Sequence, residues 1–208
     1  MTEDELLAVV DDIESLDSTT EDFATSIADS VESFLIAIRA VSHEEEAGAA
    51  ISLLLLEISQ VLLAGARLGA QVDFEPRSEY QPDVGPESDL DDMRLRLAKL
   101  LGGVDTYSLV FDPYAPEVVD SSLSDDLTSI ASDLENGLRH YRSGDVGEAL
   151  WWWQFSYVSS WGNLAGGLLN ALLSVVAHDR LDNDVTDLDA DQVAAADEML
   201  AEPVDESR

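Results

Sequence analysis

Residues 149–177 read ALWWWQFSYVSSWGNLAGGLLNALLSVVA, and none of these 29 residues is charged. An apolar run of this length forms either a transmembrane helix or a helix buried at the centre of a bundle. Gln154, Asn163 and Asn170 interrupt the run, and neither flank has the Lys/Arg cluster that orients a membrane helix. We therefore predict that the segment is a buried central helix and that the protein does not insert into a membrane.

The rest of the chain carries the apolar spacing of amphipathic helices. Apolar residues recur at steps of three and four along 23–41 and 123–141, and residues 44–69 are apolar on nearly every side. Helix-start signals, each a hydroxyl or Asp followed three residues later by an acid, begin at Thr2, Ser18, Ser42, Ser88, Ser122 and Asp145. The pattern predicts an all-α, single-domain bundle of about six helices around the buried C-terminal helix.

Two segments with prolines interrupt the helical pattern. Residues 70–87 contain three prolines and are expected to form a surface loop. Residues 102–120 contain two prolines and several aromatic residues, so we expect a loop packed over the bundle rather than a pair of strands. The predicted organisation is one helical domain over 1–180 and an acidic tail over 181–208, partly flexible or folded as a short helix.

The charge of the chain excludes several classes of function. It has 44 acidic residues against 10 Lys and Arg, which gives a net charge of −34, and no cysteine. Such a chain repels the phosphate backbone of nucleic acids, and it cannot form disulfides or use a cysteine nucleophile. The N-terminus lacks the basic region of a signal peptide, so a cytoplasmic protein is expected. The three histidines stand apart in the sequence, and we predict neither a metal site nor a cofactor.

A helical wheel of residues 150–177 separates two faces. The apolar arc is about 200° wide at about 100° per residue, and Trp151 lies near its centre, which predicts a core position for this ring. The opposite face is a stripe of small and polar residues that includes Trp152, Ser156, Ser160, Asn163 and Asn170. This stripe fits one wall of a ligand pocket closed by residues 102–120, or a close contact with another helix.

Two further groups are candidates for binding or chemistry. Arg139 and Arg142 belong to the densest cationic patch of the chain, which fits either an anion site or internal ion pairs. Glu57 lies inside the apolar run LLLLEISQVLL and is expected to be buried. A buried carboxylate needs a partner or takes up a proton, so we expect an ion pair between Glu57 and an arginine, with a catalytic acid or base as the alternative.

Several short motifs resemble a known family. They are Phe111-Asp112-Pro113-Tyr114, Gly137-Leu138-Arg139-His140-Tyr141-Arg142, Glu148-Ala149-Leu150-Trp151-Trp152-Trp153-Gln154-Phe155-Ser156 and Trp161-Gly162. These segments, in the C-terminal half, are similar to a mainly actinobacterial family catalogued as a domain of unknown function. The resemblance implies a soluble, helical, cytosolic protein whose relatives are encoded near recombination-mediator genes. The family pattern has histidines where this chain has Ser160, Leu164 and Leu173, which argues against catalysis.

Together these features favour a non-enzymatic protein-interaction or regulatory module. The expected partner is a protein, with a DNA-repair or recombination-related protein implied by the resemblance, and self-association is left open. The alternative is a small-ligand-binding protein or enzyme with a pocket beside Trp152, Ser160 and Asn163. No residue is assigned a catalytic role at this point.

Overall fold

The computed structural model describes the backbone of residues 3–76 and 82–201 and the side chains of residues 19–76 and 82–181. The helices are α1 (Glu3–Val41), α2 (Ala47–Gly69), α3 (Asp91–Leu101), α4 (Leu123–Arg142), α5 (Val146–Ser156) and α6 (Gly162–Ala201). One π-helical turn (Tyr157–Trp161) joins α5 to α6, and a 3-10 turn (Gly102–Val104) follows α3. The predicted all-α class is confirmed.

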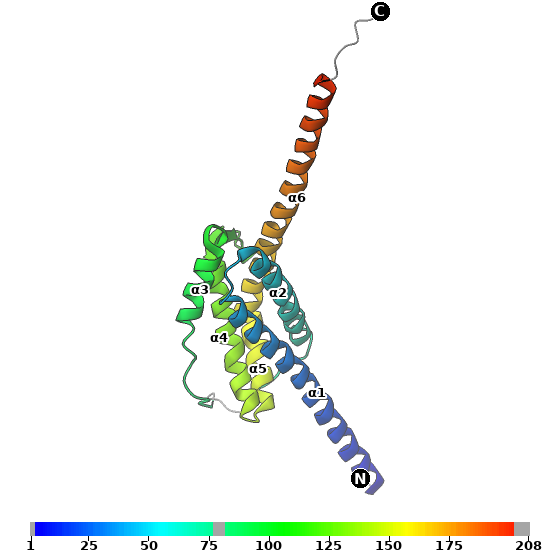
Figure 1. Cartoon of the computed structure of the whole chain (residues 1–208). Helices are drawn as coiled ribbons and strands as arrows, with labels where there is room; N and C mark the ends of the chain where they lie inside the picture. The colour runs from blue at the N-terminus through cyan, green and yellow to red at the C-terminus, as the bar shows by residue number, and fades with distance from the viewer. Residues whose placement is uncertain (1–2, 77–81, 202–208) are drawn as a thin grey trace, which may run out of the picture.

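The helices form one bundle from which two helices protrude (Figure 1). Helix α2 packs between α1 and α6, while α4 packs on α3, α5 and α1. The first part of α1 and the last part of α6 extend from the bundle on opposite sides (Figure 1). By length and composition, α2 and the segment Val146–Leu181 could also cross a membrane, a property that they share with core helices.

Helix boundaries differ from the sequence prediction at both ends of the chain. The two helices expected from Thr2 and Ser18 are one continuous helix, α1, so Ser18 does not begin a helix. The central segment is divided by the π-helical turn. Helix α6 continues past the predicted domain boundary at 180/181. Residues 202–208 of the predicted tail lie outside the described residues.

A short β-hairpin, which the sequence did not predict, precedes α4. Strands β1 (Thr106–Leu109) and β2 (Val119–Ser122) pair antiparallel, from Thr106 opposite Ser122 to Leu109 opposite Val119. Each strand is only four residues long, so neither has an apolar alternation long enough to recognise in the sequence. The expected packing of this segment over the bundle does occur, because Tyr107 and Leu109 lie against Gly167 of α6.

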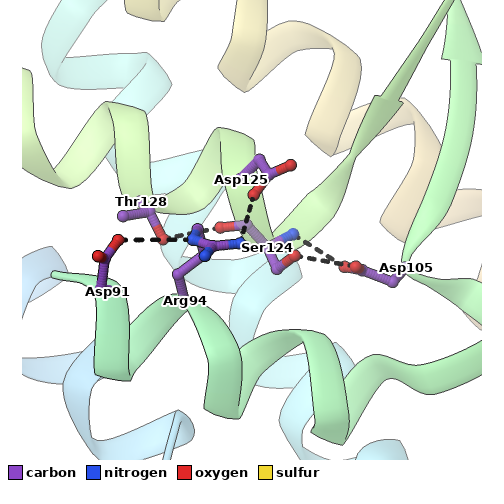
Figure 2. A network of polar contacts seen from close by, with 6 residues as sticks. All are labelled: Asp91, Arg94, Asp105, Ser124, Asp125 and Thr128. Carbon is purple, nitrogen blue, oxygen red and sulfur yellow. Dashed lines mark hydrogen bonds and ion pairs between the residues drawn. The ribbon is translucent and has the colours of Figure 1, made fainter.

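A polar network fixes the start of α4 (Figure 2). The carboxylate of Asp105, beside the hairpin, accepts hydrogen bonds from the backbone N–H and the hydroxyl of Ser124, both at 2.9 Å. From α3, Arg94 reaches Asp125 at 3.4 Å and Asp91 at 3.8 Å. Although Ser122 stands at the N-cap position as predicted, its side chain makes no capping bond. Asp105 supplies the cap from outside the helix.

Two tryptophans of the central segment occupy the core, each against a glycine of a neighbouring helix. Trp153 is 0% exposed. Its indole lies across Gly137 of α4 and donates a hydrogen bond of 3.0 Å to the carbonyl of Leu134. Trp161 is also buried and lies against Gly65 of α2. These glycines let α4 and α2 approach the central segment closely enough to enclose both rings.

The predicted core position of Trp151 is wrong. Its ring is only half-buried and stacks on Phe155, which is 52% exposed, with 5.3 Å between the ring centroids. The apolar arc of the wheel is wider than the surface that the neighbouring helices cover. Burial is centred on the side of Trp153 and Trp161, and the side of Trp151 and Phe155 is left open.

The substitution Gly137→Ala tests the packing of Trp153. A methyl group at this position would lie 2.2 Å from Nε1 of Trp153, so the ring has to shift. We expect a loss of about 1–3 kcal/mol in the free energy of unfolding, the range for overpacked cores. Urea denaturation of the variant and the wild type measures the loss.

Gly166→Ala in α6 is the matched control, because nothing lies within 4 Å of an added Cβ there. This control is expected to be neutral or slightly stabilising, as alanine favours the helix. Equal free energies of unfolding for the two variants would show that Trp153 does not lie on Gly137.

Candidate functional site

The polar stripe on the central segment divides into two parts, and the first is a helix contact. Trp152 donates its Nε1–H to the carbonyl of Asp133 at 2.8 Å, and Ser160 donates to the Asp133 carboxylate at 2.9 Å. Ser156 is buried and accepts a hydrogen bond from Trp161 at 3.2 Å. Burial raises the pKa of Asp133. Trp152 and Ser160 therefore attach the central segment to α4, while Ser156 makes its hydrogen bonds within the segment, and the predicted pocket does not extend along them.

The second part of the stripe does line a cavity. Asn163 and Asn170 face a space of about 370 Å³ between α6 and the β1 end of the hairpin. The other side chains around it come from Ser108, Leu109, Val110 and Phe111. No lining residue is charged. This space could take a small neutral ligand, but the residues around it offer no acid, base or strong nucleophile.

A buried carboxylate holds the hairpin over this cavity. Asp126 accepts hydrogen bonds from the hydroxyls of Tyr107 at 2.8 Å and Ser121 at 2.7 Å. Burial raises the pKa of Asp126. Burial and then the hydrogen bond to Asp126 raise the pKa of Tyr107, so its hydroxyl keeps the proton that it donates. The network positions the hairpin. Its carboxylate and its two hydroxyl groups already use one another as hydrogen-bond partners.

The structure does not assemble the anion site considered at Arg139 and Arg142. Arg142 pairs with Glu32 of α1 at 2.9 Å. Arg139 donates hydrogen bonds to the carbonyl of Pro86 and, at 2.7 Å, to the side chain of Asn136. Arg142 thus makes an internal ion pair, as the alternative expected, whereas Arg139 makes internal hydrogen bonds to neutral groups.

The open side of α5 forms a feature that sequence analysis missed. We call it the α5 groove, a cavity of about 350 Å³ lined by Asp73, Phe74, Trp151, Gln154, Phe155, Val158 and Ser159. The rings of Trp151 and Phe155 are nearly parallel, at 11°, and Val158 is 68% exposed. The sequence feature that could have indicated this groove is the width of the apolar arc of the central helix. Two neighbouring helices could not cover so wide an arc.

Gln154 fixes the far wall of the α5 groove. This buried side chain accepts a hydrogen bond from the backbone N–H of Phe74 at 2.8 Å and donates one to the carbonyl of Leu68 at 3.0 Å. Phe74 stacks on Phe23 of α1, with 6.4 Å between the ring centroids. The wall is thus attached to α1, α2 and α5, and the groove is preformed.

Two buried titratable groups lie away from these cavities. Burial lowers the pKa of His140, which favours the neutral ring, although the charges of Glu148 and Asp145 oppose this effect. Glu57 is 8% exposed, and its Oε2 has no hydrogen-bond partner. The expected ion pair between Glu57 and an arginine is not found among the described residues. Neither group lines the two cavities described above, so neither is assigned a catalytic role.

The family comparison covers the whole bundle. Residues 18–178 match the model of the family described as "Domain of unknown function (DUF5063)", and the chain belongs to this family. The resemblance noted in the C-terminal half was therefore too narrow, since the match begins in α1. None of the curated proteins compared with the chain is significantly similar to it.

A solved structure shares the fold. The crystal structure of protein BF1032 from Bacteroides fragilis is similar with a TM-score of 0.59 and 16% sequence identity, over 72% of this chain and 89% of that one. Identity this low relates the folds alone. The family and its solved relative give no activity, so the function has to be argued from the site.

The substitution Glu57→Gln tests the burial of this carboxyl group. Burial raises the pKa of Glu57 above its ordinary value of 4.5. At pH 7 the charged carboxylate is disfavoured in the folded state only, so the uncharged variant is expected to be more stable than the wild type. As the pH falls to 4.5 the wild-type group takes up its proton on folding, and the difference should shrink.

Urea denaturation of both proteins at pH 7 and pH 4.5 measures this difference. A difference in free energy of unfolding that stays constant over this range would show that the Glu57 carboxylate is solvated in the folded protein.

Proposed function

We propose that the protein is a non-enzymatic interaction module of the cytoplasm that docks a basic segment of a partner protein in the α5 groove. The main observation behind this proposal is the aromatic surface formed by Phe155, which is 52% exposed, and the half-buried ring of Trp151, next to the exposed Val158. Large apolar groups gathered on the surface of a small bundle mark interaction sites more often than isolated exposed residues do. Aromatic anchors of this kind dominate binding energies in protein interfaces.

Charge selects the kind of partner. The chain carries a net charge of −34. A field of this sign attracts basic surfaces and repels acidic ones, including a second copy of the chain and any nucleic acid. A DNA-repair or recombination-related protein, the partner class that the family resemblance implied, fits this requirement because proteins that bind nucleic acids carry basic surfaces.

The chemistry of the cavities supports binding over catalysis. Four serine hydroxyls donate a hydrogen bond to an aspartate carboxylate, and among the described side chains no histidine is hydrogen-bonded to any of these pairs, which are Ser108–Asp120, Ser121–Asp126, Ser124–Asp105 and Ser160–Asp133. The described side chains contain no group of three or more His, Asp or Glu placed to hold a metal ion. The cavity beside Asn163 and Asn170 supports the alternative function, the binding of a small neutral ligand.

Affinity capture with four forms of the tagged full chain separates these proposals. The forms are the wild type, Phe155→Ser, Leu63→Ser and Asn163→Leu, and the lysate comes from cells that express the protein natively. Leu63 is 66% exposed on α2 and is the matched control for the loss of an exposed apolar side chain. Thermal unfolding of each variant verifies that it is folded.

We expect a basic protein to be retained by the wild type and by Leu63→Ser, and its retention to fall with added salt. Phe155→Ser should weaken the binding about tenfold or more, the loss expected for an aromatic anchor. Equal retention by the wild type and Phe155→Ser would contradict docking in the α5 groove. Loss of retention in Asn163→Leu alone would instead place the site in the cavity under the hairpin.

A further inference from the structure

We propose that the α5 groove receives a single cationic side chain, an arginine or a lysine, of the docked segment. The inference rests on the proposed function and specifies what the groove recognises. It depends on one juxtaposition: three aromatic residues, Phe74, Trp151 and Phe155, line the groove together with the acidic residue Asp73. The aromatic rings and the carboxylate both favour a cationic group.

Three aromatic residues line the groove. Phe74 comes from the segment that follows α2, and the stacked pair of Trp151 and Phe155 comes from α5. The face of an aromatic ring carries partial negative charge and attracts an ammonium or guanidinium group within about 6 Å. A volume of about 350 Å³ is sufficient for such a head group with its methylene stem. The stem would pack against Val158, which is otherwise exposed.

The carboxylate of Asp73 is available to a docked cation. Asp73 is exposed and makes no hydrogen bond or ion pair within the part of the chain that the structure describes. Glu75, two residues further along, is also exposed. No basic residue lines the groove. A cation entering between the rings therefore gains a charge partner that the described fold does not already use.

The neighbouring rings show the same recognition inside the chain. The guanidinium of Arg67 lies 5.3 Å from the centroid of the Phe23 ring, and Phe23 in turn stacks on Phe74. Arg67 is held there by a hydrogen bond of 2.9 Å to the hydroxyl of Ser26. At one end of these stacked rings, Phe23 thus already contacts a cation, and at the other end Phe74 lines the groove.

A pair of small probes tests the inference directly. Phenethylguanidinium and phenethylurea have nearly the same shape and differ in charge. Each is titrated into the full-length protein, and binding is followed by the NMR signal of the Trp151 indole N–H. The variants are Asp73→Asn and Phe155→Leu, with Glu117→Gln as the control for losing one exposed carboxylate elsewhere.

We expect phenethylguanidinium to bind the wild type about tenfold more tightly than phenethylurea, from the ring and carboxylate contacts together. Asp73→Asn and Phe155→Leu should each reduce this preference to about threefold, and Glu117→Gln should leave it unchanged. A preference that survives Asp73→Asn in full would overturn the role of this carboxylate.

The two probes also separate failure of the inference from failure of the proposed function. Equal affinity for both probes would overturn recognition of a cation and leave the groove as an apolar docking site. Binding of neither probe at millimolar concentration would overturn both.

Discussion

The contact between the Trp153 indole and Gly137 is the constraint on which the bundle depends. The ring lies against Gly137 of α4, so the two helices approach more closely than any side chain at position 137 would allow. Its Nε1–H is satisfied by the carbonyl of Leu134, which removes the cost of burying a polar group. The sharp turn between α4 and α5 then follows, because residues only 16 positions apart must meet face to face.

This constraint determines where the aromatic residues of the WWW run point. Successive residues of a helix are about 100° apart, so enclosing Trp153 directs Trp152 along α4 and Trp151 away from it. Trp152 finds a hydrogen bond to Asp133 at the edge of the core. Trp151 meets Phe155 one turn further on and forms the α5 groove with the segment held by Gln154. The core and the proposed docking site therefore have one geometric origin.

Sequence alone was sufficient for the fold class, because residues 23–41 and 123–141 have the apolar periodicity of helices and residues 44–69 are apolar on nearly every side. It did not show that α1 is one continuous helix. It was insufficient for the groove. The apolar arc of the central helix contains more aromatic side chains than the neighbouring helices can cover. Which rings are enclosed depends on the positions of Gly65 in α2 and Gly137 in α4. The hairpin was missed for a related reason, since its place depends on Asp126, Tyr107 and Gly167, which come from three elements.

Hydrogen exchange of the four indole N–H groups, followed by NMR in the wild-type protein, tests this account most directly. The N–H groups of Trp153 and Trp161 are buried and hydrogen-bonded, so they should exchange only when the bundle unfolds. The N–H of Trp151 makes no hydrogen bond within the described residues and should exchange orders of magnitude faster. Equal protection of Trp151 and Trp153 would contradict the account, because it would place both rings in the core and leave no open groove on α5.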